Sequence, residues 1–326
     1  MAASLLVVAE VAEGAVTRLS LEVATLARTL AEEEGLEVSG LVVAADAAGP
    51  AAELAAYLPT VHAVSVPALS GEVPAGATAA AVLERIDAGA THVFLGASAD
   101  GRDVAGALVG LTGWGLLVNA SAAAWQDGGP TVQGVVLGGK AVTTYRLTAD
   151  TGIVTVGTGA VTAAPAVSAG AVVPGAAPAP NAALPAVRVL DRVEEAGAAV
   201  SLEDAKVVVV GGRGVGGPEG FELVGELAEL LGGVVAATRA SVDSGWIPYA
   251  RQIGQTGKTV KPRLYLGLGV SGAMQHRVGM QGSETIVIVN RDPDAPIREV
   301  ADLMVIGDLF AVGPALVAEL RARAAG

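Results

Sequence analysis

Short runs of branched apolar residues alternate with segments of helical periodicity along this chain, and the whole pattern occurs twice. In the first half, the apolar runs predict strands at Leu5–Val11, Val38–Ala45, Ala63–Val66 and His92–Gly96. The segments between them predict helices at Val16–Glu34, Ala51–Leu58, Thr78–Ala88 and Asp103–Leu111. This order is typical of a parallel sheet covered by helices on both faces. Hydrophobic residues make up 52% of the chain and aromatic residues only 3%, so Ala, Val and Leu must build the cores.

The pattern becomes more β-like after Leu116, where Thr131–Val136 and Ala141–Leu147 predict antiparallel strands. The segment Ala163–Pro185 is rich in Pro, Ala and Gly, which favours an extended linker and marks a composition boundary. A length of 326 residues is sufficient for two cores. We therefore predict an N-terminal α/β domain with a mainly parallel sheet at 1–199, ending in this linker, and a C-terminal domain at 200–326.

The second series of elements begins with a continuous apolar run. Strands are predicted at Lys206–Gly212, Val234–Ala237, Leu264–Val270, Thr285–Val289 and Met304–Ile306, with helices at Pro218–Leu231 and Leu309–Arg323. The C-terminal domain is therefore predicted to be a five-stranded, doubly wound parallel sheet.

Composition and charge argue against several classes of function. The absence of cysteine excludes disulfides, thiolate metal sites, iron–sulfur clusters and a cysteine nucleophile, and three histidines argue against an imidazole-rich metal site. The net charge of −13 argues against a nucleic-acid partner. The uncharged stretches, Gly106–Trp125 and the one between Asp150 and Arg188, are interrupted by Gly, Pro and polar residues, so neither predicts a membrane span. The N-terminus has no basic region typical of a signal peptide, and we expect a cytoplasmic protein.

Two glycine-rich loops suggest nucleotide binding. Gly212–Gly217 matches G-x-G-x-x-G between a predicted strand and helix, and Arg239 follows the next strand, where it could meet a 2′-phosphate. An NADP-dependent oxidoreductase is therefore one hypothesis, although no hydride-transfer site is recognisable. Gly254–Thr259 looks like a P-loop, but Gln252 stands where that motif needs glycine and a strand follows instead of a helix.

The segment Leu264–His276 carries the strongest signal of a binding site. An apolar strand runs into a Gly-Ser-Gly turn, which opens a short helix carrying Gln275 and His276. Such a turn aims backbone N–H groups at an anionic ligand. The next strand ends in Asn290, at the same edge of a parallel sheet. The sequence thus predicts the rim of a cofactor site, with Ser271 also facing it.

Several segments in a fixed order carry a family resemblance: Thr238–Arg239, Gly254–Lys258, Leu264–His276, Asn290–Pro296, and Asp302 with Gly307–Phe310. Together they resemble the alpha subunit of the electron transfer flavoproteins. Leu5–Glu10 and Gly96–Arg102 extend the resemblance more loosely into the first half. The chain departs from the family at Arg291, where lysine is usual, and at Arg298, where phenylalanine is usual; Gly267 and Met274 also differ.

The resemblance implies a heterodimer with a beta subunit, which would bind AMP, while this chain binds FAD in its C-terminal domain. The N-terminal domain would contribute partner contacts. Such proteins take electrons from flavin dehydrogenases, for example those that oxidise acyl-CoA in fatty acid beta-oxidation. They deliver them to a quinone-linked oxidoreductase through semiquinone and hydroquinone states. The chain would then be an electron carrier without a substrate, a catalytic residue or a metal of its own.

The resemblance also implies roles for individual residues. Arg239 would stack over the isoalloxazine ring, Thr256 would meet the ring near N5, and a protonated His276 would face its N1–O2 edge. The full set of implied cofactor contacts is Arg213, Thr238, Arg239, Ile253, Gly254, Gln255, Thr256, Ser271, Gly272, Ala273, Met274, Gln275, His276, Asn290, Asp308 and Leu309. A nucleotide-binding or scaffold protein that has the fold but no flavin remains the other alternative.

Overall fold

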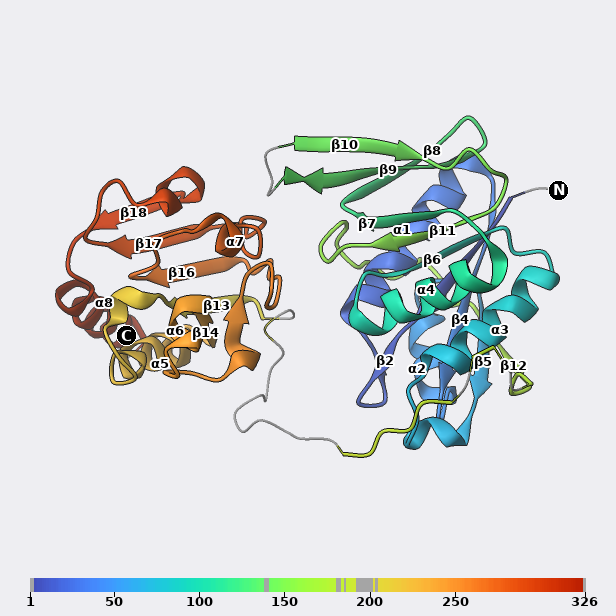
Figure 1. Ribbon diagram of the computed structural model, residues 1–326, viewed down its shortest axis with the longest axis horizontal. Helices are drawn as coiled ribbons and strands as arrows, with labels where there is room; N and C mark the ends of the chain where they lie inside the picture. Colours follow the sequence, from blue (N-terminus) through green and yellow to red (C-terminus); the bar gives the residue numbers. More distant parts are fainter. Residues whose placement is uncertain are drawn as a thin grey trace. The chain divides into compact units, whose positions relative to one another are not determined.

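The computed structural model describes residues 3–137, 141–179, 183–184, 186–191, 202 and 205–324 (Figure 1). The chain divides into two compact units, 1–192 and 193–326. The domain boundary predicted between residues 199 and 200 lies outside the described residues.

A seven-stranded parallel sheet forms the centre of the N-terminal unit, in the order β12-β5-β4-β1-β6-β11-β7. Its strands are β1 (Ser4–Ala9), β4 (Glu37–Ala44), β5 (Thr60–Ser65), β6 (His92–Gly96), β7 (Leu116–Ala120), β11 (Gly152–Val156) and β12 (Ala171–Gly175). A separate antiparallel sheet contains β8 (Ala122–Gln126), β9 (Gly129–Val136) and β10 (Ala141–Arg146), and a small hairpin contains β2 (Val11–Ala12) and β3 (Ala15–Val16).

Helices cover both faces of the seven-stranded sheet, because successive side chains of a buried strand point in opposite directions. Leu5 and Val7 of β1 pack with α1 (Arg18–Glu34) and α2 (Ala48–Leu54). Leu6 and Val8 pack with α3 (Ala75–Asp87) and α4 (Ala99–Thr112) on the other face. The short helix η1 (Pro67–Ser70) lies between β5 and α3.

The C-terminal unit is built on a six-stranded parallel sheet in the order β15-β14-β13-β16-β17-β18. The strands are β13 (Val207–Gly211), β14 (Val234–Thr238), β15 (Gln252–Ile253), β16 (Leu264–Leu268), β17 (Ile286–Asn290) and β18 (Leu303–Ile306). The helices are η3 (Arg213–Val215), α5 (Gly220–Leu230), α6 (Arg239–Asp243), η4 (Tyr249–Arg251), α7 (Met274–Arg277), η5 (Pro296–Val300) and α8 (Leu309–Ala324).

Two cores cover this sheet. Val209 and Leu266 pack with α5 and α8 on one face. On the other face, Val208 and Tyr265 pack with Ile253 of β15, and with Met280 and Ile297 from the segments that connect the later strands. The parallel α/β architecture predicted for both halves is confirmed.

The structure corrects three details of the sequence prediction. The C-terminal sheet has a sixth strand, β15, which is too short to leave an apolar run in the sequence. In the N-terminal unit, β7, β8 and β11 were also not predicted. Finally, the Pro/Ala/Gly segment is not only a linker, because Ala171–Gly175 pairs in parallel with β5 as an edge strand. An edge strand tolerates Pro174, because an N–H on the outer side of such a strand has no neighbouring strand to which it could donate.

Candidate cofactor site

The predicted site residues come together at the carboxyl edge of the C-terminal sheet. They follow or end the six strands: Arg213 after β13, Thr238 and Arg239 at β14, Ile253–Thr256 at β15, Ser271–His276 after β16, Asn290 at β17, and Asp308 and Leu309 after β18. The strand order changes direction between β13 and β16. Open parallel sheets bind ligands outside the strand carboxyl ends at such a point.

The loop after β16 presents a run of backbone donors. The N–H groups of residues 271–275 have no hydrogen-bond acceptor among the described residues. By contrast, the N–H of Gly269 donates to the carbonyl of Val289 at 2.9 Å. Consecutive free N–H groups in a turn form a concave donor surface that suits an anionic group such as a diphosphate. The geometry therefore fits the phosphates of a dinucleotide.

Gly272 gives this loop its shape. Its φ of +81° lies in the left-handed region, and a Cβ at this position would come within 2.3 Å of the backbone nitrogen of Ile297. Ile297 N–H in turn donates to the carbonyl of Ser271 at 3.1 Å. Only glycine fits here, because a side chain would both strain the backbone and push η5 away.

The loop Gly212–Gly217 is used differently from a dinucleotide fingerprint. The N–H of Gly212 donates to Leu268 O at 2.9 Å, and that of Gly214 donates to Gly269 O at 3.0 Å. A Cβ on Gly212 would come within 2.3 Å of Gly269 O. These glycines let the β13 loop pack on the β16 loop, so their N–H groups do not face a pyrophosphate. Arg213 is exposed beside them.

The loop after β15 is held from below by a buried amide. Gln252, which is 2% exposed, donates through Nε2 to the hydroxyl of Thr256 at 3.1 Å. Tyr249 donates its hydroxyl to the backbone carbonyl of Thr256. Gln255 N–H donates to the carbonyl of Gln275 at 2.7 Å, which joins this loop to α7. Thr256 itself is exposed.

Arg239 begins α6 directly after β14. Its side chain is 66% exposed and lies 3.2 Å from the carboxylate of Asp243, one helical turn later. Thr238 is buried, and its hydroxyl lies 3.3 Å from that of Ser241, which donates to Gly211 O. The guanidinium thus stands at the carboxyl edge on a short helix that a buried hydroxyl pair anchors.

His276 differs from the expectation of a protonated ring. Nδ1 lies 3.0 Å from the carbonyl oxygen of Ile253, and Nε2 lies 2.7 Å from the hydroxyl of Tyr265. Burial lowers the pKa of His276 to about 4, opposed by the hydrogen bond to Ile253. The ring is therefore neutral at pH 7 in this structure, because desolvation disfavours the imidazolium.

The remaining predicted contacts shape the rim. Asn290 donates through Nδ2 to Val270 O at 2.8 Å, which fixes the start of the free N–H run. Asp308 accepts from the N–H of Phe310 at 2.9 Å and so caps the beginning of α8. Leu309 is 6% exposed, and its methyl group lies against Gly269.

Sequence reasoning missed Gln252 and Tyr265. Both are fully buried polar side chains that hold predicted site residues in place. Tyr265 leaves a signal in the sequence, since it is a polar residue inside the apolar run of β16, eleven residues before His276. Gln252, four residues before Thr256, leaves no such signal, because β15 is too short to form an apolar run. Only the fold brings Tyr265 and His276 together.

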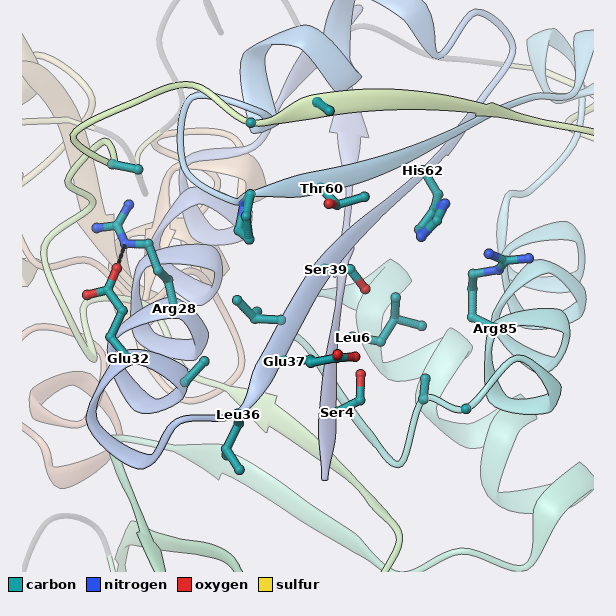
Figure 2. A pocket seen from close by; sticks show the side chains of 18 of the residues that line it. Ser4, Leu6, Arg28, Glu32, Leu36, Glu37, Ser39, Thr60, His62 and Arg85 are labelled. Carbon is teal, nitrogen blue, oxygen red and sulfur yellow. Dashed lines mark ion pairs between the residues drawn. The ribbon is translucent and has the colours of Figure 1, made fainter. Parts of the chain in front are cut away.

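A cavity of about 1190 Å³ also opens in the N-terminal unit (Figure 2). It lies at the amino ends of β1, β4 and β5, where Ser4, Glu37 and Thr60 begin those strands. Arg28 on its rim is engaged by Glu32 and donates to two backbone carbonyls. This is the opposite edge from the one at which parallel sheets hold ligands.

Each half of the chain matches a known protein-family domain. Residues 5–189 match the electron transfer flavoprotein domain, and residues 201–281 match the electron transfer flavoprotein FAD-binding domain. The electron transfer flavoprotein subunit alpha of Mycobacterium leprae is 42% identical over 98% of this chain and 99% of its own length.

The chain belongs to the electron transfer flavoprotein alpha-subunit family.

Another member of this family, from Thermoanaerobacterium thermosaccharolyticum, is 54% identical over 134 residues, 41% of this chain and 41% of its own length. Membership in the electron transfer flavoproteins assigns this chain a role in electron transfer. In the described part of the chain, no helix is long and apolar enough to cross a membrane, and no group of three or more His, Cys, Asp or Glu side chains could hold a metal.

Proposed function

We propose that this chain is the FAD-holding subunit of a heterodimer with an electron transfer flavoprotein beta subunit. It takes electrons from flavin dehydrogenases, such as those that oxidise acyl-CoA in fatty acid beta-oxidation, and passes them to a quinone-linked oxidoreductase. It carries electrons and has no substrate of its own. The observation that carries this proposal is the run of N–H groups at residues 271–275, which have no acceptor in the described part of the chain. The run lies at the switch point of a domain that matches the family's FAD-binding domain.

The proposed contacts divide along the carboxyl edge. The N–H groups of residues 271–275 hold the diphosphate, and Gly272 keeps them in one concave turn. Asn290, Asp308 and Leu309 lie toward the adenosine end. Arg239, Thr256 and His276 lie toward the isoalloxazine ring. The rest of the predicted set, Arg213, Thr238, Ile253, Gly254 and Gln255, lines the floor and the rim between them.

The chain's part is to bind, orient and tune, while bound FAD supplies the redox chemistry. Arg239 supplies the positive charge beside the ring, because His276 is neutral in its buried position. Thr256 presents a hydroxyl whose oxygen already accepts from Gln252, so its proton is available to a flavin nitrogen. No step needs a nucleophile, a general base or a metal.

The hydrogen bonds of the loop after β13 argue against the NADP-dependent alternative. Its fingerprint requires N–H groups of the Gly212–Gly217 loop to face a pyrophosphate, and those of Gly212, Gly214, Val215 and Gly216 donate within the protein. In the proposed heterodimer, the beta subunit binds AMP.

The test is the absorption spectrum of this chain co-expressed with its beta subunit. We expect a yellow complex with one FAD in this subunit and AMP in the other, whose flavin is reduced by an acyl-CoA dehydrogenase with substrate. Gly272→Ala should yield a complex with little flavin, whereas Gly225→Ala, a glycine of α5 with open space around it, should retain the yellow colour. A colourless wild-type complex that does not take up added FAD would overturn the proposal.

A further inference from the structure

Tyr265 is a tyrosine in the middle of the C-terminal sheet whose hydroxyl meets a ring nitrogen of a site residue. Its side chain is fully buried in β16, and the hydroxyl lies 2.7 Å from Nε2 of His276. The two rings meet edge to face, with centroids 6.1 Å apart. A buried tyrosine hydroxyl requires a hydrogen-bond partner, and His276 supplies it.

The neighbouring groups determine where the proton of His276 resides. The carbonyl of Ile253 can only accept, so Nδ1, 3.0 Å away, must carry a hydrogen and donate it. A neutral imidazole protonated at Nδ1 has a lone pair at Nε2. Tyr265 donates its hydroxyl hydrogen to that lone pair. Both ring nitrogens are thus used inside the protein, and one tautomer satisfies both partners.

The same ring connects three elements of the candidate site. His276 on α7 contacts β15 through Ile253 and β16 through Tyr265. Beside it, Gln255 N–H donates to Gln275 O, and a Cβ on Gly254 would come within 2.9 Å of that same oxygen. The charged neighbours are engaged with each other, since Arg277 donates to Glu299. The ring therefore sets the position of α7, whose first two residues carry the last of the free N–H groups.

We propose that Tyr265 is a positioning residue of the flavin site, which holds His276 as a single neutral Nδ1–H tautomer and thereby fixes α7 against the loop after β15. The proposal rests on the proposed function in one respect, that the group held by the site is a flavin. The positive charge of the site is supplied by Arg239.

The test is nitrogen NMR of histidine in the complex with the beta subunit, with FAD bound and after its removal. The chain has three histidines, so His62→Gln and His92→Gln spectra assign His276. We expect long-range ¹H–¹⁵N correlations at pH 7 to show one protonated nitrogen, Nδ1, in both states. A doubly protonated ring, or a ring protonated at Nε2, would overturn the proposal.

Two changes at Tyr265 test its part directly. Tyr265→Phe should move the Nε2 resonance toward that of a nitrogen with a free lone pair and change the midpoint potential of bound FAD. Tyr57→Phe, a hydroxyl removed from the N-terminal unit, should change neither. Incorporation of 3-fluorotyrosine, a stronger donor, retains the buried hydroxyl and should move Nε2 the opposite way. An unmoved Nε2 resonance in both cases overturns the role of Tyr265. Absence of FAD from the complex would overturn the proposed function alone, because the tautomer is also measured without FAD.

Discussion

The two parallel sheets of this chain share a strand order around their centres, yet their carboxyl edges differ in what the backbone leaves free. In both sheets, the first strand lies between the second and the fourth parallel strand of its unit. In the C-terminal sheet, the N–H groups of residues 271–275 have no acceptor among the described residues. At the corresponding edge of the N-terminal sheet, side chains accept from some of the loop N–H groups, while those of residues 98–100 have no acceptor among the described residues.

Three contacts show which groups the side chains occupy at the N-terminal edge. The hydroxyl of Ser98 accepts from Gly101 N–H at the beginning of α4 and donates to the carboxylate of Glu10. The buried carboxylate of Glu22 accepts from Gly159 N–H at 2.6 Å. Glu10 N–H donates to Ser20 Oγ at 2.8 Å. The comparison indicates that the fold supplies an edge suited to anions, and that the side chains decide how much of that edge remains available.

The largest effect is expected from closing the open edge with a single methyl group. Gly272→Ala places a Cβ within 2.3 Å of Ile297 N at a φ of +81°. We expect loss of bound FAD and a decrease of roughly 3 kcal/mol in the stability of the C-terminal unit. Flavin absorbance per complex and hydrogen exchange measure the two effects. Gly225→Ala in α5 should instead stabilise that unit by about 0.5 kcal/mol. Equal behaviour of the two variants would contradict the role of Gly272 in shaping the loop that binds the diphosphate.

A second prediction concerns the one histidine of each unit whose pKa is lowered most. Burial lowers the pKa of His92 and of His276 to about 4, from an ordinary value of 6.5. Because the unfolded chain then binds protons more readily than the folded one, stability is fully present above pH 6.5 and is lost as the pH falls toward 4. Protonation of each histidine in the unfolded state should lower the free energy of unfolding of its unit by about 2 kcal/mol at pH 5.

Hydrogen exchange at pH 7.5 and pH 5 resolves the two units. His92→Phe, which retains the edge-to-face contact with Trp125 at 5.0 Å, should flatten the pH dependence of the N-terminal unit only. The control is His62→Gln, since His62 is less buried. A pH dependence that persists unchanged in His92→Phe would show that another group is responsible.

A smaller effect is expected on the flavin itself. Arg239→Ala removes the exposed cation at the carboxyl edge, and it should lower the midpoint potential of bound FAD by roughly 50 mV, close to a tenfold change in the one-electron equilibrium. Spectroelectrochemistry of the complex measures it. Arg263→Ala removes the same charge just before β16, at the opposite end of that strand, and should leave the potential unchanged. Equal shifts in both variants would indicate a general effect of net charge.

The smallest effect is expected at the carboxyl edge of the N-terminal sheet. Ser98→Ala removes the side-chain cap of α4 and should destabilise the N-terminal unit by about 1 kcal/mol, without changing the FAD content. Hydrogen exchange of the amides in α4 measures it, and Ser70→Ala, on the exposed helix η1, is the control. A loss of flavin from Ser98→Ala would contradict the expectation that this edge has no part in FAD binding.

Much of the architecture could be predicted from local patterns. The continuous apolar runs predicted the central strands of both sheets because a strand buried on both faces needs no polar alternation. The prediction failed where this signal is absent. The two residues of β15 form no run, and β12 is an exposed edge strand that contains Pro174.

The sequence by itself determined the parallel α/β architecture, the family and the loops that carry the candidate site, because periodicity, glycines and motif spacing are local properties. Only the tertiary structure decided which N–H groups stay free and which ring nitrogen of His276 carries the proton. The sequence motif suggests that Gly212 binds a phosphate, whereas in the structure its N–H donates to the carbonyl of Leu268. The sequence resemblance suggests that His276 is a cation, whereas in the structure its two ring nitrogens meet Tyr265 and Ile253. Hydrogen-bond partners and desolvation come from residues distant in sequence, and these determine the charge and the availability of a group.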